Sequence, residues 1–406
     1  MTIAEVAGAA RRRWMPVACA VLAATFAGFA QTTDKARLDI YGFAMLDMGY
    51  QTESNDPDWF DVVRPTKLPS FEGEFGEDGR TYAGVRQSRF GVKGFIPTSK
   101  GEIKTIFEFE LFGVGPDAGQ TTFRLRHAWG EFNHWGAGQS WSPFMDIDVF
   151  PNSIEYWGPN GMVFFRNVQI RWMPLQGANE VHVALERPGA SGDPGVASGA
   201  PEFGDLSGRF PLPDLSAHYR MNRDWGHVQV AGIARKITWD DNDPNAPNLS
   251  GDAIGWGINL SSNLKFSEDV LRLSVVYGEG IENYMNDATF DVGLTLDAAG
   301  LVDEDVGEAL PILGVSAFYD HTWNSKFTSS IGYSMVDIEN SDGQLATAFN
   351  RGRYALANLL YHPTENLMWG GELQWGDRKN FEDDFTSHDT RVQISVKYNF
   401  AHTLGG

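Results

Sequence analysis

Two arginines stand two positions apart in the run TTFRLRHAWGEF, at Arg124 and Arg126. In an extended strand, residues two apart point to the same face, so both guanidinium groups would emerge side by side, with His127 on the other face. A guanidinium presents a planar fork of N–H donors that matches the two oxygens of a carboxylate. The pair is therefore a candidate binding surface for small anions, and for carboxylates in particular.

Three further basic residues share the orientation of this pair. Alternation of apolar and polar positions places Arg89 and Lys93 of SRFGVKG on the same side of their predicted strand, and it orients Arg171 of VQIRW likewise. Arg86 and Arg166 fall out of phase with their neighbours and would need a β-bulge to join the group. The sequence thus predicts one basic surface assembled from several strands.

The segment GQSWSPFMDIDVFPNSIEYWGPNG, residues 138–161, carries acids and aromatic residues between two predicted strands. Its prolines and glycines exclude a regular helix, and its aromatic side chains argue against a fully solvated loop. We expect this segment to fold inward and to narrow the space beside the basic surface. The residues expected at this constriction are Asp146, Asp148, Glu155, Phe144, Tyr156 and Trp157.

Two alternatives stay open for this segment. It could be an ordinary external loop, although its aromatic residues speak against that interpretation. Its acids could also pair with the arginines, which would produce a field across the constriction but little selectivity between anions and cations.

Other kinds of chemistry find no support in the residue pattern. The histidines show no spacing to serine or aspartate that suggests a catalytic set, so we expect no enzyme. No glycine-rich phosphate loop and no Cys/His metal cluster occurs, and Cys19 is the only cysteine, so we expect no cofactor and no metal. A net charge of −21 makes the chain a poor partner for nucleic acid.

The elements that must position the basic surface alternate with a period of two residues. Runs such as LDIYGFAMLDMGY, KTIFEFEL and RVQISVKYNF place apolar residues on one face and polar residues on the other. About sixteen such segments follow one another, most of them long enough to cross a bilayer at a tilt, with Tyr and Trp near their ends. They cover residues 38–50, 82–96, 101–113, 121–132, 135–141, 162–173, 180–187, 214–222, 226–239, 252–264, 269–279, 311–322, 327–338, 352–362, 366–376 and 391–400. Short turns alternate with long, acidic loops. The pattern predicts an all-β fold, a 16-stranded antiparallel transmembrane β-barrel with an inward-folded constriction loop.

The ends of the chain divide it into four expected segments. Three arginines precede an apolar run that ends in small residues, which predicts a secretory signal peptide over residues 1–30. A short periplasmic segment at 31–37 then leads into the barrel at 38–400, and residues 401–406 form a tail. Such a barrel belongs in the Gram-negative outer membrane, where acidic outer loops could bridge divalent cations to lipopolysaccharide.

Three stretches resemble the DcaP-like porins, trimeric outer-membrane channels of Gram-negative bacteria. They are SRFGVKG, the run from Arg124 to Trp172, and the terminal VQISVKYNF. The resemblance implies a sixteen-stranded barrel, an inward third loop, and passive uptake of negatively charged small molecules, notably dicarboxylates. It implies a role at the constriction for arginines at four positions here, Arg89, Arg124, Arg126 and Arg171. Some members carry a periplasmic coiled coil before the barrel, for which the expected segment 31–37 is too short, so a trimer would rest on the barrel wall.

The expected function is therefore passive diffusion of small hydrophilic solutes with a preference for anions such as dicarboxylates. The alternative is a non-specific or weakly cation-preferring general diffusion or sugar porin, which the acids of the first long loop and the aromatics of the constriction segment would suit. Lipid, lipopolysaccharide, small anions and two further copies of the chain are the expected partners.

Overall fold

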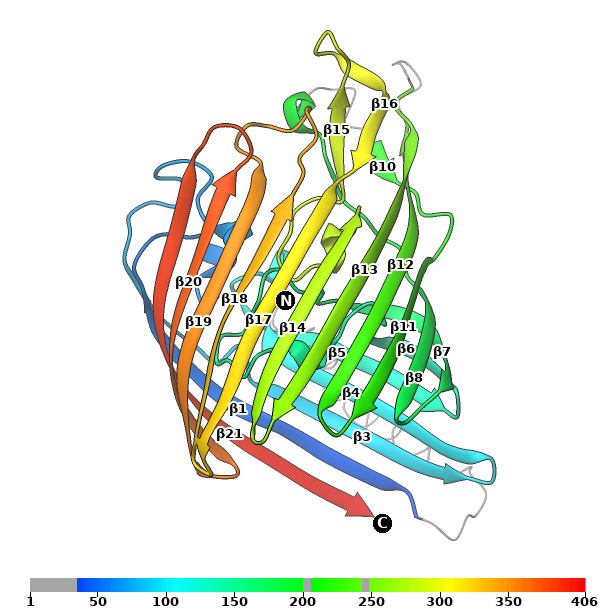
Figure 1. Ribbon diagram of the computed structural model, residues 1–406, viewed down its shortest axis with the longest axis vertical. Helices are drawn as coiled ribbons and strands as arrows, with labels where there is room; N and C mark the ends of the chain where they lie inside the picture. The colour runs from blue at the N-terminus through cyan, green and yellow to red at the C-terminus, as the bar shows by residue number, and fades with distance from the viewer. Residues whose placement is uncertain (1–34, 200–205, 243–247, 406) are drawn as a thin grey trace, which may run out of the picture.

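A computed structural model describes residues 35–199, 206–242 and 248–405, so the expected signal peptide at 1–30 lies outside the described residues. Sixteen antiparallel strands close into one barrel (Figure 1). They are β1 (Arg37–Gln51), β3 (Arg89–Thr98), β4 (Gly101–Phe112), β5 (Thr121–Phe132), β6 (Trp135–Trp141), β7 (Arg166–Leu175), β8 (Asn179–Glu186), β11 (Asp214–Arg223), β12 (Gly226–Asp241), β13 (Gly251–Phe266), β14 (Asp269–Glu279), β17 (Pro311–Asn324), β18 (Phe327–Ile338), β19 (Phe349–Thr364), β20 (Leu367–Asn380) and β21 (Thr386–Gly405).

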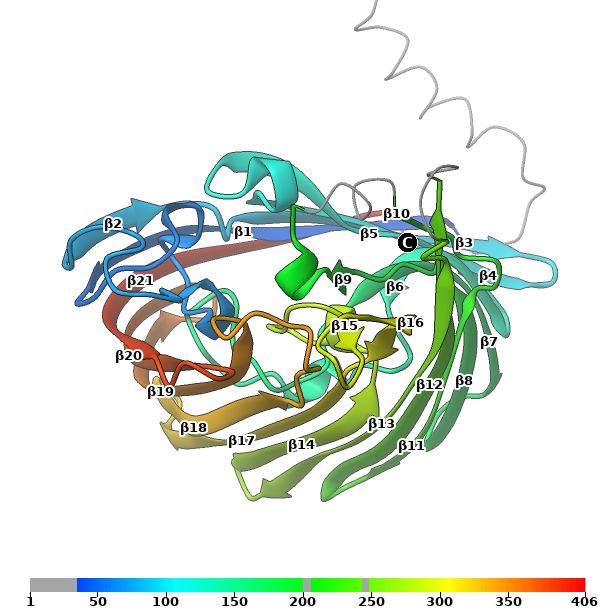
Figure 2. The ribbon, with the colours of Figure 1, turned by 90° about the horizontal axis from the view of Figure 1, so that it is seen from above.

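The first and last strands close the ring. β1 pairs with β21 along its whole length, from Arg37 opposite Gly405 to Gln51 opposite Arg391. On its other side β1 pairs with β3, and each barrel strand then pairs with the next one in the chain. Figure 2 looks down on this ring. Because the sheet closes on itself, each of the described barrel strands has a hydrogen-bonded neighbour on both sides.

The barrel is apolar outside and polar inside, the reverse of a water-soluble sandwich. In β21, Val392 and Ile394 are 53% and 59% exposed, whereas Arg391 and Gln393 between and beside them are almost completely buried. In β1, Leu46 and Met48 are exposed while Asp47 is buried. An apolar band on the outer surface is stable in lipid, and polar side chains inside satisfy one another or meet water. The predicted alternation is confirmed.

Short turns join the strands at one end of the barrel and long loops join them at the other. The loops contain the short strands β2 (Arg80–Gly84), β9 (Gly192–Asp193), β10 (Leu206–Gly208), β15 (Val292–Leu296) and β16 (Val302–Ala309). β9, β15 and β16 form a small separate sheet. Figure 1 shows β15 and β16 beyond the barrel rim. Within the described residues, no helix has the length and apolar character needed to cross a membrane.

Several expected boundaries differ from the structure by a few residues, and three of the differences have a clear structural cause. The strand expected over residues 82–96 is interrupted at 85–88, because Arg86 turns inward to bond Asp61. The strand expected from residue 162 begins at Arg166, since the preceding residues belong to the inward-folded segment. The expected tail at 401–406 is mostly strand, because residues 401–405 pair with β1 and lengthen β21.

A β-bulge changes the orientation of side chains within β5. Glu108 of β4 pairs with His127, and Phe109 pairs with Leu125, so Arg126 has no partner in the register. The extra residue lets Arg126 and His127 both point inward, and both are buried. The expectation that His127 faces lipid or another subunit was wrong for this reason. The ring of His127 packs edge-on against Trp141 with centroids 5.0 Å apart.

Candidate functional site: an arginine wall facing an inward loop

Four arginines meet two glutamates on the inner surface of the barrel. We name this group the arginine wall; it consists of Arg89 (β3), Glu108 and Glu110 (β4), Arg124 and Arg126 (β5) and Arg166 (β7). Four positive and two negative side chains leave a formal excess of two positive charges. The closed barrel and its short strand spacing bring these side chains together from sequence positions far apart.

Arg126 is the centre of the arginine wall. Its Nε donates to Glu108 and its Nη1 to Glu110, both at 2.6 Å. The Arg126 side chain is only 5% exposed. A buried arginine that serves two carboxylates holds them in place and compensates their charge. Arg126 therefore stabilises the wall and is poorly placed to bind a passing solute.

Arg89 and Arg124 keep part of their surface open to solvent. Their side chains are 25% and 27% exposed. Arg89 donates to Glu110 at 3.3 Å, and the Arg124 nitrogen lies 3.5 Å from the other oxygen of Glu110. Both contacts are longer than those of Arg126, so these guanidinium groups retain free N–H donors. They are the members of the wall that an anion in water would meet.

Arg166 completes the wall from β7. Its nitrogen lies 3.8 Å from Glu110, and its guanidinium stacks 4.9 Å from the Trp141 ring. The residue starts its strand, so its side chain can turn inward although the alternation of β7 would direct it outward. Arg86, the other out-of-phase arginine, lies elsewhere and bonds Asp61 and backbone carbonyls.

Two predicted members of the basic surface lie apart from the arginine wall. Lys93 points inward nearer the short-turn end and is exposed, with its nitrogen 4.9 Å from the Tyr41 ring. Arg171 is buried and uses its donors on Gln169 and on the carbonyl oxygen of Trp141. Their roles as solute contacts stay predictions.

Residues 142–165, which we call the constriction loop, fold into the interior of the barrel (Figure 2). Phe144 is fully buried in the main hydrophobic cluster of the interior, among residues of β12, β14, β17 and the segment around Tyr284. Tyr156 stacks on Phe112 with ring centroids 3.8 Å apart, and Trp157 packs edge-on against Trp59 at 4.9 Å. Aromatic side chains anchor the loop in this way because each buries a large apolar area.

The loop attaches to the barrel through its acids as well as its aromatics. Asp146 is buried and is bonded by Arg220 at 3.1 Å, His227 at 2.6 Å and Ser261 at 2.7 Å. The hydrogen bonds from His227 and Ser261, together with the charge of Arg220, outweigh burial and lower the pKa of Asp146. Asp148, which also bonds Arg220, is half exposed.

Glu155 is buried at the other end of the loop. It accepts a hydrogen bond from the backbone N–H of Val63 at 3.2 Å, while its own N–H donates to Glu372 of β20 at 3.1 Å. Burial raises the pKa of Glu155 to about 7, and the nearby carboxyl of Glu372 adds to the rise. Asp146 and Glu155 thus fasten the loop, and of the three expected acids only Asp148 reaches the solvent. The arginine wall pairs with β4 glutamates rather than with these loop acids.

The loop and the wall meet at Tyr156, and the guanidinium of Arg166 also lies 6.0 Å from the centroid of the Phe164 ring of the loop. The hydroxyl of Tyr156 bonds Glu110, and Arg124 approaches the same hydroxyl at 3.4 Å. The side chains of Arg89, Arg124 and Asp148 are partly exposed to solvent. An inward loop that narrows a wide barrel beside a charged wall can select solutes by size and by charge.

Sequence reasoning missed several residues of this arrangement. Glu108 and Glu110 lie on the polar face of the run KTIFEFEL, but their pairing with the arginines depends on strand register, which the sequence does not reveal. The alternation of its strand does not predict the inward position of Arg166, because a residue at a strand end need not follow the alternation. Arg220 and His227, the partners of Asp146, carry no local signal at all, since they bind a loop far away in the chain.

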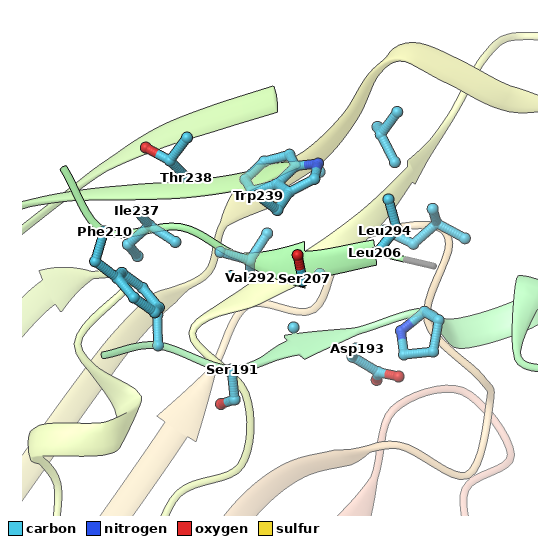
Figure 3. A pocket seen from close by; sticks show the side chains of 17 residues that line it. Ser191, Asp193, Leu206, Ser207, Phe210, Ile237, Thr238, Trp239, Val292 and Leu294 are labelled. Atoms are coloured by element: carbon cyan, nitrogen blue, oxygen red, sulfur yellow. The ribbon is translucent and has the colours of Figure 1, made fainter. Parts of the chain in front are cut away.

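A separate pocket of about 270 Å³ lies at the long-loop end (Figure 3). Segments from β9, β10, β12, β15 and β16 surround it, and its labelled side chains include Trp239, Phe210 and Asp193. Among the described residues that line it there is no member of the arginine wall. The pocket belongs to the outer loops rather than to the constriction.

A closed barrel with an apolar outer band and a charged interior narrowed by a loop defines an outer-membrane channel of the porin type. The sequence matches the DcaP outer membrane protein family over residues 30–400, and the chain belongs to that family. It is a protein of the Gram-negative outer membrane. The curated protein sequences contain no match to the chain.

Solved structures share the fold. The crystal structure of the outer membrane channel DcaP of Acinetobacter baumannii has a TM-score of 0.74 at 21% identity, covering 92% of this chain and 100% of that one. OmpT of Vibrio cholerae, in its trimer form, has a TM-score of 0.55 at 12% identity, with 90% and 100% covered. The anion-selective porin from Comamonas acidovorans has a TM-score of 0.54 at 11% identity, with 90% and 100% covered.

Proposed function

We propose that this channel favours small anions, dicarboxylates in particular, as they diffuse past the arginine wall. The observation that carries the proposal is the excess of positive charge on the wall, of which Arg89 and Arg124 are partly open to solvent. Both guanidinium groups approach the carboxylate of Glu110, so they are close enough together to bind the two ends of one dicarboxylate. Because the neighbouring loop narrows the bore, a solute would pass close to these groups and meet little screening.

Flux measurements with paired solutes test this proposal. Purified protein in liposomes would be supplied with labelled succinate or with the uncharged diamide of nearly the same size. We expect succinate to enter faster, because the wall attracts its carboxylates and leaves the diamide unaffected. Equal rates, or faster entry of the diamide, would contradict anion preference while leaving the channel itself intact.

A general diffusion porin is the second candidate. The half-exposed Asp148 opposes anion entry, and Glu108 and Glu110 already neutralise half of the arginine charge. If these acids dominate the field at the constriction, the channel would pass sugars and cations as readily as anions. The same paired-solute experiment separates the two candidates.

We also propose that the channel works as a homotrimer, as one solved relative of similar fold does in its trimer form. The outer surfaces of β3, β4 and β5 expose Phe90, Phe107 and Phe123, and Phe123 is 81% exposed. Such rings would be covered by lipid or by a neighbouring subunit. Migration as a trimer in unheated detergent gels, lost in a Phe123→Asp variant that still folds, would support the assembly; a monomer under all mild conditions would contradict it.

A further inference from the structure

Two histidines and a glutamate gather on the inner face of the barrel, apart from the arginine wall. His182 of β8 lies directly opposite His218 of β11 in the strand register, and their rings lie 4.5 Å apart. Glu180 lies two residues before His182 and so shares its face. One side-chain ligand atom from each of the three lies within 4.8 Å of the others, and all three residues are partly buried.

Hydrogen bonding leaves lone pairs of both histidines unused. The Nδ1 of His218 lies 2.9 Å from the carbonyl oxygen of Pro143, which only accepts, so Nδ1 carries the proton and Nε2 carries the lone pair. That Nε2 is buried and has no hydrogen-bond partner among the described residues. The Nδ1 of His182 is equally buried and unpartnered within the described chain. Buried nitrogens without partners are unfavourable unless something else binds them.

We propose that His182, His218 and Glu180 form a binding site for one divalent transition-metal ion of the zinc, copper and nickel type. Imidazole nitrogens with one carboxylate suit these ions, whereas calcium and magnesium prefer oxygen ligands throughout. Three protein ligands leave a position for water or for a carboxylate solute. Sequence spacing gave no sign of such a site, because the histidines belong to different strands and meet only through pairing.

Neighbouring groups orient the ligands as metal sites require. The bond from His218 to Pro143 fixes its tautomer, which is the usual arrangement of a metal-binding histidine. Asn222 donates to one oxygen of Glu180 at 2.8 Å and leaves the other oxygen available. Two cations, Arg171 and Arg220, act on the histidine pair. Arg220 is compensated by Asp146 and Asp148, which reduces its repulsion of a metal ion, whereas Arg171 bonds only the neutral Gln169 and Trp141 carbonyl and opposes the ion.

The distances describe a site that closes slightly on binding. Ligand atoms around an ion at about 2.1 Å in tetrahedral geometry lie roughly 3.4 Å from one another. The present separations lie within 4.8 Å, so small rotations of the side chains are sufficient to bring the ligand atoms to this spacing. Partly exposed side chains can make such rotations at little cost.

A zinc titration by calorimetry on tag-free, folded protein in detergent tests the site. We expect saturable binding of one ion per chain that is unaffected by a large excess of magnesium. The variant His182→Ala with His218→Ala should weaken binding at least about tenfold. His134→Ala is the matched control, because His134 also contacts a backbone carbonyl, at 2.9 Å, but belongs to no metal-ligand group of the described residues.

Spectroscopy with cobalt keeps the test decisive if the double variant fails to fold. The wild-type protein should give the visible absorption of tetrahedral cobalt. The milder Glu180→Gln variant should change the intensity of this absorption and the affinity for cobalt, while it keeps the heat-dependent gel shift of a folded barrel. Non-saturable binding by the wild-type protein, or equal weakening in the His134→Ala control, would overturn the proposal.

Discussion

Removing the two solvent-accessible arginines should shift the ion preference of the channel toward cations. The variant Arg89→Ala with Arg124→Ala takes away the excess of two positive charges. It leaves Arg126 and Arg166 to compensate the two glutamates, so no buried carboxylate loses its main partner. Arg126 itself is unsuitable for this test, because its removal would disturb the wall as a structure.

The size of the shift follows from exposure and distance. Unit charges 4 Å apart interact by about 1 kcal/mol in water and about 4 kcal/mol in a medium of dielectric constant near 20. The side chains of Arg89 and Arg124 are 25% and 27% exposed, so we take a value near the lower limit, about 1 kcal/mol for each. Loss of both should lower the anion permeability by roughly tenfold to thirtyfold, since 1.36 kcal/mol corresponds to a factor of ten. The anion-to-cation permeability ratio should fall further, because the same charges repel cations.

Reversal potentials in planar bilayers under a KCl gradient measure this ratio. The shift should be largest at low salt and should shrink near 1 M, where the Debye length falls to about 3 Å. Arg209→Ala with Arg223→Ala removes the same charge from exposed positions in an outer loop and a strand turn, and should leave the potential unchanged. If the control shifts as much as the wall variant, net charge rather than the wall sets the preference, and our reasoning fails.

Three other perturbations test the structure of the site. Arg126→Met leaves two buried carboxylates undercompensated and should destabilise the barrel by about 3–5 kcal/mol in urea unfolding; a change below 1 kcal/mol would refute its structural role. Asp146→Ala removes the attachment of the constriction loop and should raise single-channel conductance, whereas unchanged conductance would mean that the loop holds without it. The pKa of Glu155 is raised from 4.5 to about 7, so the fold favours its protonated form. The contribution of Glu155 to the free energy of unfolding is therefore fully present below pH 4.5 and is lost as the pH rises through 7. Current fluctuations should therefore increase between pH 5 and 8 in the wild-type channel and lose this dependence in Glu155→Gln; an equal dependence in both would exclude Glu155 as the source.

The fold was predictable because a membrane barrel carries its orientation in every strand. The strands at 121–132, 135–141, 269–279 and 327–338 have the boundaries that the alternation predicts. Because lipid surrounds the barrel and water fills its interior, side chains alternate between the two faces of each strand. The two-residue alternation is therefore sufficient to predict which side chains face lipid and which face the interior. Prediction failed where the chain departs from that period, at the interruption before β3 and at the bulge beside Arg126.

The site was predictable in its residue types but less so in its partners. Arg89, Arg124 and Arg126 were recognised from strand phase, and they meet in the barrel. Which carboxylates they pair with depends on register between strands, which small shifts would change. The attachment of Asp146 to Arg220 and the meeting of His182 with His218 depend on how the loop and the ring close, and a local reading of the sequence contains neither.

The most direct test of the central idea is the sign of the reversal potential of the wild-type channel in a tenfold KCl gradient at low ionic strength. An arginine wall with excess positive charge beside a narrowed bore predicts a reversal potential displaced from zero toward the equilibrium potential of chloride. A reversal potential displaced toward the equilibrium potential of potassium would contradict this prediction, because the acids of the interior would then determine which ions pass.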